Sequence, residues 1–248
     1  MNYNTHSDEK VSSLSVIVPA YEEEILLEDT IKQLVNTITK FIEDPEIIII
    51  NDGSTDLTGQ IAEELSKSHK FIFSYHQEQN QGFGEAIRLG FAKASKEYVT
   101  FIPADHLFSA EELDIYLTII KYADVVIGYR RGRREDLGLY PWLISVVYHK
   151  IVNWLFGIDY YDVNWIHLYK RDQLEQFLGR SDGVFLLAEN LIRCRELKLK
   201  VVGVDVDFIE RSAGVATGRK VSTILKTLSE LLKFWYTNRL NISKKWST

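Results

Sequence analysis

The segment "PEIIIINDGSTD", Pro45 to Asp56, decides the fold class of this chain. Four consecutive isoleucines followed by a polar turn predict a strand that is buried on both faces and delivers a loop at its end. Strands of this kind belong to parallel sheets that are covered by helices on both sides. We therefore expect an α/β protein whose chemistry lies in the loops that follow the strands.

The same pattern extends in both directions from this segment. Short apolar runs predict further strands at 14–21, 71–77, 98–103, 123–130 and 201–208. Amphipathic runs predict helices at 24–38, 57–67, 84–95, 109–121 and 221–236. Asp56 and Ser109 are expected to cap the helices that follow them, the latter in a capping box with Glu112. Alternating strands and helices imply a mostly parallel central sheet with right-handed crossovers.

Composition limits the class of protein. The chain has 248 residues, 46% of them hydrophobic, and no Pro/Gly/Ser-rich linker divides it. We expect an irregular N-terminus over 1–13, one domain over 14–220, and a C-terminal amphipathic helix and tail over 221–248. A formal net charge of −6 argues against general nucleic-acid binding. The polar N-terminus, the single cysteine Cys194 and the lack of an apolar run of ~18 residues together favour a cytoplasmic location.

Polar side chains follow several predicted strands. They are Tyr21, Glu23, Asp52, Asp105 and Arg130. Because parallel strands end at one edge of a sheet, we expect these side chains to converge there. Acids at such an edge suit either a diphosphate handled through a divalent cation or a base and ribose bound by carboxylates. Asp52 also has a purely local interpretation, because Asp-Gly is a common turn dipeptide.

Two helical segments have an apolar stripe that the sequence leaves open to two interpretations. In the segment 139–158 the stripe comprises Leu143, Val147, Ile151 and Trp154. In the last helix it comprises Ile224, Leu225, Leu228, Leu231, Leu232 and Trp235, with Lys226 and Lys233 elsewhere. Such stripes usually pack into a core. Trp, Tyr and Lys flanks also suit a helix that lies in a membrane interface.

An ordered set of motifs carries a resemblance to a known family. The motifs are "VIVPAYEEE", "EIIIINDGSTDLT", "NQGFGEAIRLGFAKAS", "YVTFIPAD", "DVVIGYR", "RDQLEQF" and "AENLIRCRELKLKVVGVDVDF". The chain resembles the family 2 glycosyltransferases of GT-A fold over about 14–218. Within them it is most similar to the dolichol-phosphate mannosyltransferase-like branch, which glycosylates polyprenyl phosphates. The resemblance implies a Rossmann-like GT-A sheet, a nucleotide-diphosphate sugar donor and Mg²⁺ or Mn²⁺.

The resemblance also implies a role for particular residues in donor binding. The nucleotide site would comprise Pro19, Tyr21, Glu23, Asp52, Gly82 and Asp105. Asp52 would read the base, and Gly82 would let the backbone approach the donor. Asp105 would be the surviving acid of a D-x-D motif and would bind the metal and the diphosphate. This metal site is weakened, because Pro103 and Leu107 stand where the family has two further ligands.

Acceptor binding and catalysis are implied in the same way. Arg130, Arg131 and Ser145 would meet the acceptor phosphate, although Pro141 replaces an arginine expected near Ser145. The expected reaction is an inverting transfer, in which the metal and the two arginines stabilise the leaving group. A polyprenyl phosphate acceptor needs no general base. A saccharide hydroxyl does, and Glu189 stands where hydroxyl-glycosylating relatives place theirs.

Two other functions stay open at this level. A degenerate GT-A domain that binds a nucleotide or a protein partner without turnover would explain the altered D-x-D motif. A different nucleotide-dependent transferase, such as a nucleotidyltransferase, would use the same strand-end acids. The sequence also allows peripheral contact with the inner face of a membrane and a homodimer.

Overall fold

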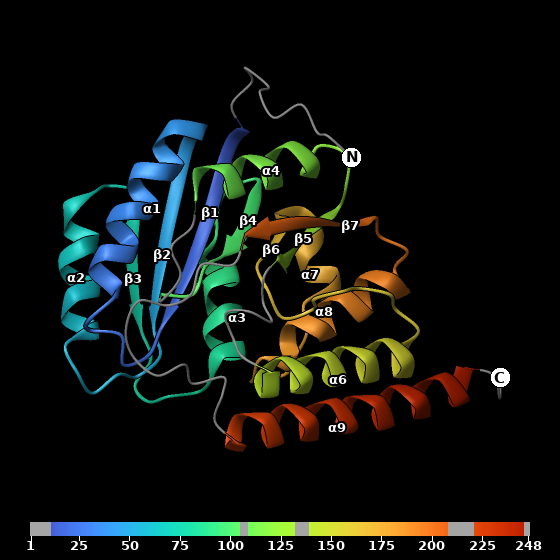
Figure 1. Ribbon diagram of the computed structural model, residues 1–248. Coiled ribbons are helices and arrows are strands. Elements are labelled where there is room, and N and C mark those ends of the chain that lie inside the picture. The colour runs from blue at the N-terminus through green and yellow to red at the C-terminus, as the bar shows by residue number, and fades with distance from the viewer. Residues whose placement is uncertain (1–10, 105–108, 132–138, 208–220, 246–248) are drawn as a thin grey trace.

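The computed structural model of the protein describes residues 11–104, 109–131, 139–207 and 221–245. In this part of the chain, seven strands form one sheet in the order β3-β2-β1-β4-β6-β5-β7 (Figure 1). The strands are β1 Val11–Ala20, β2 Ile42–Asn51, β3 Ile72–His76, β4 Tyr98–Phe101, β5 Val125–Arg131, β6 His167–Lys170 and β7 Val201–Asp207. The helices are α1 Leu27–Phe41, α2 Thr58–Ser68, α3 Phe83–Lys93, α4 Ala110–Ile120, α6 Leu139–Phe156, α7 Arg171–Phe177, α8 Phe185–Glu196 and α9 Val221–Lys245.

The sheet is mostly parallel, as the sequence predicts. β1 pairs in parallel with β2 and β4, β2 with β3, and β5 with β7. β6 runs antiparallel to both of its neighbours, β4 and β5. The two reversals cancel, so β5 and β7 point the same way as β1 to β4. The carboxyl ends of these six strands therefore share one edge of the sheet.

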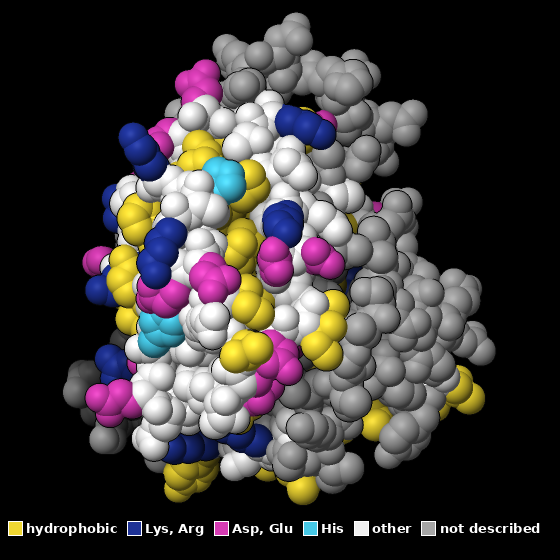
Figure 2. Space-filling model, turned by 90° about the vertical axis from the view of Figure 1, so that its left-hand side faces the viewer, with side chains coloured by type: hydrophobic (Ala, Val, Ile, Leu, Met, Phe, Trp, Pro, Cys, Tyr) yellow, Lys and Arg dark blue, Asp and Glu magenta, His cyan; other side chains and the backbone are white. Residues whose placement is uncertain are grey.

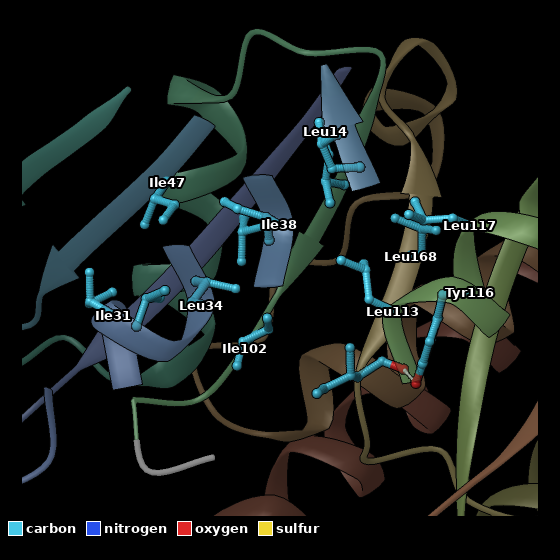
Figure 3. Packing of buried hydrophobic residues seen from close by; sticks show 14 of the residues in the cluster. Leu14, Ile31, Leu34, Ile38, Ile47, Ile102, Leu113, Tyr116, Leu117 and Leu168 are labelled. Atoms are coloured by element: carbon cyan, nitrogen blue, oxygen red, sulfur yellow. Dashed lines mark hydrogen bonds between the residues drawn. The ribbon is translucent and has the colours of Figure 1, made fainter. Parts of the chain in front are cut away.

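The run of four isoleucines is buried on both faces of β2. Ile47 and Ile49 belong to the core cluster beneath α1, α2 and α4, and Figure 3 shows Ile47 beside the α1 residues Ile31 and Leu34. Ile48 and Ile50 belong to the second cluster, on the opposite face of the sheet. This alternation is what a central parallel strand requires, and it confirms the prediction for the segment.

Helices cover both faces of the sheet in two layers. Buried side chains of α1, α2 and α4 form the first cluster with one face, and those of α3, α6, α7, α8 and α9 form the second with the other. Ser109 caps α4, because its Oγ accepts a hydrogen bond of 3.0 Å from the Glu112 amide. The sequence predicts this cap correctly.

Some boundaries differ from the predicted ones. β1 begins at Val11, inside the segment expected to be irregular, because Val11 pairs with Ile42 at the start of an equally long β2. β6 and α7 have no predicted counterpart, and α9 extends to Lys245. None of the described helices is long and apolar enough to cross a bilayer.

Candidate active site

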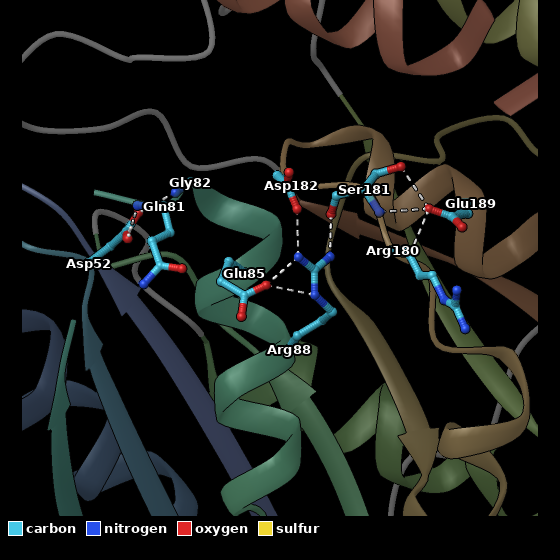
Figure 4. A network of polar contacts seen from close by, with 9 residues as sticks. All are labelled: Asp52, Gln81, Gly82, Glu85, Arg88, Arg180, Ser181, Asp182 and Glu189. Carbon is cyan, nitrogen blue, oxygen red and sulfur yellow. Dashed lines mark hydrogen bonds and ion pairs between the residues drawn. The ribbon is translucent and has the colours of Figure 1, made fainter. Parts of the chain in front are cut away.

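Asp52 lies directly after β2, at the carboxyl edge of the sheet. Its side chain is 3% exposed, and it accepts hydrogen bonds from the amides of Gln81 at 2.7 Å and Gly82 at 3.0 Å (Figure 4). Burial raises the pKa of Asp52 above its usual value, although the two amides and Lys226 act in the opposite direction. Asp52 thus ties the loop after β2 to the loop before α3.

The loop after β1 is bound to the loop after β2. The Glu22 amide donates to Ser54 Oγ at 3.0 Å, and the Glu22 carboxylate accepts from the Thr55 amide at 2.8 Å. The Glu23 amide donates to Thr58 Oγ1 at 2.8 Å. These contacts place Tyr21 and Glu23 next to the Asp52 loop, and Pro19 pairs with Ile50 in the adjacent strand. Of the residues predicted to converge at this edge, Tyr21, Glu23 and Asp52 therefore lie on two loops that contact each other.

The start of α3 packs against the segment 180–183 that precedes α8. Gly82 has a φ of +100°, and a Cβ placed on it would lie 2.6 Å from the Asp182 carbonyl oxygen. The Gly84 amide donates to that same oxygen at 2.8 Å. Arg88 adds a hydrogen bond to the Ser181 carbonyl and an ion pair to Asp182, both at 2.6 Å. Only glycine fits at position 82, since both the backbone angle and the space exclude a side chain.

Glu189 is the buried end of this network, as Figure 4 shows. The side chain is 2% exposed. One carboxylate oxygen accepts from the amides of Arg180 and Ser181 at 3.0 Å and from Ser181 Oγ at 2.7 Å. The other accepts from Arg193 Nε at 3.0 Å and Nη2 at 2.7 Å. The residue proposed as a general base therefore holds the segment 180–183 in place.

A groove adjoins this network between α8 and α9. It has a volume of about 530 Å³ and is lined by acids and bases in near-equal number. The basic lining residues are Arg180, Arg193 and Lys233, and the acidic ones are Asp182, Glu189, Glu196 and Glu230. Such a mixed lining suits a polar ligand better than an apolar one.

A second polar cluster lies where β5 ends. Arg130 pairs bidentately with Asp162 at 2.6 and 3.0 Å, and its guanidinium stacks 4.4 Å from the Trp165 ring. His149 Nε2 lies 3.3 Å from Asp162, and His149 Nδ1 lies 3.4 Å from Ser145 Oγ. The structure thus joins Arg130 to Ser145, two residues expected at an acceptor phosphate. The sequence reasoning missed Asp162, because nothing in its spacing marks it as the partner of a residue 32 positions away.

Two further expected site residues, Asp105 and Arg131, lie wholly or partly outside what the structure describes. The chain is described as far as Ala104, whose carbonyl accepts a hydrogen bond of 2.7 Å from Thr30 Oγ1 at the same edge of the sheet. Asp105 lies outside the described residues, and so does Leu107. Arg131 pairs with Asp207 through the ladder between β5 and β7, and its side chain is not described.

The described residues test whether a divalent cation fits here. Among them no group of three or more acids, histidines or cysteines could hold a metal ion, and each carboxylate oxygen of Asp52 accepts one hydrogen bond from a backbone amide. Mg²⁺ in nucleotide sites is often held by one or two carboxylates together with substrate phosphates and water. Asp105 directly follows Ala104 in the sequence, so the chain can supply one carboxylate to a site of this kind.

A family comparison decides the identity of this fold. The family model described as "Glycosyl transferase family 2" matches residues 15–178. The chain belongs to glycosyl transferase family 2. The matched region runs from β1 through the Asp52 loop, α3 and the Arg130–Asp162 cluster to the end of α7.

Curated relatives of this glycosyltransferase domain match different shares of it. Glycosyltransferase GlyA of Streptococcus pneumoniae is 33% identical over 130 residues, which are 51% of this chain and 18% of GlyA. An undecaprenyl-phosphate 4-deoxy-4-formamido-L-arabinose transferase of Photorhabdus laumondii is 26% identical over 84% of this chain and 63% of its own. Dolichyl-phosphate beta-glucosyltransferase ALG5D of Trichomonas vaginalis is 26% identical over 97% of this chain and 78% of its own. The chain thus spans less than two thirds of the first two of these relatives.

Solved structures show the same fold. Glucosyl-3-phosphoglycerate synthase of Mycobacterium tuberculosis, in complex with Mn²⁺, UDP and glucosyl-3-phosphoglycerate, superposes with a TM-score of 0.66. The superposition covers 90% of this chain and 79% of that chain at 18% sequence identity. Together with the sheet order, this establishes the GT-A fold that the sequence predicts.

Proposed function

We propose that this domain is an inverting glycosyltransferase that moves a sugar from a nucleotide-diphosphate sugar to the phosphate of a polyprenyl phosphate. The names of two relatives, an undecaprenyl-phosphate transferase and a dolichyl-phosphate glucosyltransferase, support that acceptor. In this reaction an acceptor phosphate oxygen bonds to the anomeric carbon of the sugar. The bond from that carbon to the diphosphate breaks, and its electron pair leaves with the nucleoside diphosphate.

The hydrogen bonds to the Glu189 carboxylate are the observation that favours a phosphate acceptor over a sugar hydroxyl. A sugar hydroxyl must lose a proton to a base, whereas a phosphate acceptor is already an anion. Glu189 is buried, and its carboxylate accepts five hydrogen bonds, two of them from Arg193. Both carboxylate oxygens are occupied by these contacts, so a sugar hydroxyl would have to displace one of them to reach Glu189. A saccharide acceptor is the alternative.

Arg130, Arg131 and Ser145 are the proposed acceptor-phosphate residues. The contacts of Arg130 with Asp162 and Trp165 fix the plane of its guanidinium. An oriented guanidinium matches the geometry of a phosphate. Ser145 joins the same cluster through His149, so both side chains are held at the strand-end edge that carries the donor loops.

The donor is proposed to bind at the loops after β1 and β2. Pro19, Tyr21 and Glu23 would line the nucleotide site, while Asp52 would hold the base and Gly82 would admit the diphosphate. Asp105 would hold Mg²⁺ or Mn²⁺, which would neutralise charge on the diphosphate. Neighbouring structures that contain Mn²⁺ or Mg²⁺ with UDP support a divalent cation in this fold.

The proposed acceptor also sets the location. Polyprenyl phosphates dissolve in bilayers, so the reaction would take place in the cytoplasm at the inner face of a membrane. A homodimer is not needed for any of these contacts. Light scattering tests whether a second copy of this chain covers one surface of the molecule.

A transfer assay tests the proposal. The domain is first screened by thermal shift with UDP-, GDP- and CMP-sugars, with and without Mn²⁺, and then incubated with the donor that binds and with polyprenyl phosphate in detergent. The expected product is a lipid-linked sugar. Transfer to a saccharide alone would select the alternative acceptor. Donor binding without transfer to either acceptor would select the degenerate GT-A domain.

A further inference from the structure

An apolar stripe of α6 faces outward. Leu139, Leu143, Val147 and Trp154 are 59%, 44%, 53% and 82% exposed. The sequence interpretation of this stripe as core packing is therefore wrong for three of its four predicted members, and only Ile151 is partly buried. The opposite side of α6 does enter the core, through Val152 and Phe156. Helical spacing places the four exposed residues within one narrow arc.

α9 has a matching stripe and lies alongside α6 (Figure 1). Leu225, Leu228, Leu232 and Tyr236 are 61%, 38%, 52% and 62% exposed. The core side of α9 is marked by Leu231, which is fully buried, and by Phe234, whose ring contacts Phe156 of α6 and Phe185 of α8. Since Phe234 and the stripe lie on opposite sides of the helix, both stripes point away from the core. We call these eight exposed side chains the α6–α9 face.

The surface over α1 and α2 differs from this face. Figure 2 shows the side formed by α1 and α2, where hydrophobic side chains are interspersed with lysines, arginines and acids. In the α6–α9 face large apolar side chains recur on two neighbouring helices, with the exposed Lys150 between Val147 and Trp154 on α6. Exposed apolar side chains gathered in this way mark contact sites in soluble proteins.

Charge indicates which partner would cover the face. α6 has no acid at all, and α9 has one, Glu230. The two helices carry six lysines or arginines in a chain whose formal net charge is −6. They are Lys150, Lys226, Lys233, Arg239, Lys244 and Lys245. A basic pair of helices with exposed Leu, Trp and Tyr has the composition of segments that lie in the headgroup region of anionic bilayers.

We propose that the α6–α9 face is a membrane-docking surface that inserts its apolar side chains into the headgroup region of an anionic bilayer. Trp154 and Tyr236 suit that region, because aromatic side chains with a polar atom concentrate at membrane interfaces. The helices lie on the bilayer rather than cross it. The exposed lysines Lys150, Lys226 and Lys233 add attraction to anionic lipids, while a second copy of this chain would meet like charge.

The docking surface adjoins the proposed donor site. A Cβ on Gly82 would lie 3.4 Å from Lys226 Nζ, so the first turns of α9 reach the loop that Asp52 holds. Ser145 lies on α6 itself. Resting on the proposed function, this arrangement would bring the edge that carries the donor loops to the membrane surface, where a lipid-linked phosphate emerges.

Vesicle flotation tests the inference. Wild-type protein is mixed with phosphatidylcholine vesicles and with vesicles that also contain phosphatidylglycerol, at low and high salt. We expect binding to the anionic vesicles, weakened by salt. The double variant Trp154→Ser/Leu232→Ser should bind roughly tenfold or more weakly, because two large apolar side chains no longer enter the lipid. Tyr122→Ser is the matched control, since Tyr122 is 70% exposed at the opposite edge of the sheet, and it should bind as wild type.

Each other outcome overturns the inference. Wild-type protein that stays unbound, or a double variant that floats as well as wild type, would show that the α6–α9 face does not dock on membranes. Light scattering on the same samples checks for a second copy. A wild-type dimer that the double substitution converts to a monomer, with unchanged vesicle binding, would assign the face to a chain–chain interface. Circular dichroism confirms that each variant folds.

Donor binding, measured by calorimetry without vesicles, separates this inference from the proposed function. Loss of donor binding in the wild type would overturn the function and leave the membrane surface standing. Donor binding without vesicle binding would overturn the membrane surface and leave the proposed function standing.

Discussion

The two parts of the sheet hold their polar groups in different ways. In the part formed by β1 to β4, the acids at the strand ends accept hydrogen bonds from backbone amides, as Asp52 does from Gln81 and Gly82. In the part formed by β5 to β7, a buried arginine and a buried acid, Arg130 and Asp162, hold each other. Backbone amides stay in place whatever the side chains are, whereas an ion pair depends on both partners. The first arrangement therefore depends on the fold of the loops, and the second on the identity of both side chains.

The largest effect expected from this difference is at Asp162. Asp162→Ala would leave Arg130, which is 10% exposed, without its carboxylate partner. Breaking a buried ion pair from one side costs about 3–5 kcal/mol. Urea unfolding should show a loss of that size. The double variant Arg130→Met/Asp162→Ala should recover part of it, and equal losses in the single and double variants would show that the pair is not the cause.

Glu189 combines the two arrangements, because it accepts hydrogen bonds both from backbone amides and from an arginine, so its substitution is expected to have an intermediate effect. Glu189→Gln keeps the shape of the side chain but weakens the contacts with Arg193 and the segment 180–183, at a cost of about 1–3 kcal/mol. If Glu189 is structural, transfer to a polyprenyl phosphate should fall by less than about tenfold, or ~1.4 kcal/mol. Full stability together with loss of transfer to a saccharide hydroxyl would restore Glu189 as a base.

Ser109 precedes α4, the helix that connects β4 of the first part to β5 of the second. Ser109→Ala removes the hydrogen bond from the Glu112 amide and should cost about 1 kcal/mol. Thermal unfolding measures this loss. Ser109→Thr is the control and should retain most of the stability. An alanine variant as stable as wild type would show that the cap does not contribute.

The smallest expected effect is a dependence on pH. Because burial raises the pKa of Asp52, the folded state holds its proton more tightly than the unfolded state does. The contribution of Asp52 to stability is therefore present below its unfolded pKa and is lost as the pH rises through its folded pKa. The stability of wild type relative to Asp52→Asn should be lower at about pH 7 than at about pH 4.

Unfolding curves at the two pH values measure that change. Asp124 supplies the opposite case, because hydrogen bonds from the Lys200 amide lower its pKa. Relative to Asp124→Asn, the stability of wild type should increase as the pH is raised through the acidic range. The same sign for both acids would contradict the assignment of burial as the cause at Asp52.

The sequence predicts the first part of the fold better than the second. Ile47 to Ile50 and the turn after them specify a doubly buried strand with an acid at its end, and local pattern is enough for that. β6 has only four residues, His167–Lys170, and its direction depends on pairing with β4 and β5, which are distant in sequence. The partnership of Arg130 with Asp162 is equally non-local. An apolar stripe such as that of α6 has the same pattern whether it faces the core or the surface of the molecule, so only the exposed fractions of Val147 and Trp154 decide between the two.

The reversed strand β6 also fixes a length. It separates β4 from β5, so Thr100 and Val126, which both pair with Leu168, lie two strand spacings apart, or about 10 Å. Hydrogen bonds between main chains set that width, and no exchange of side chains would narrow it. Under the proposed function, main-chain hydrogen bonds therefore set the distance that a transferred sugar must span between donor and acceptor.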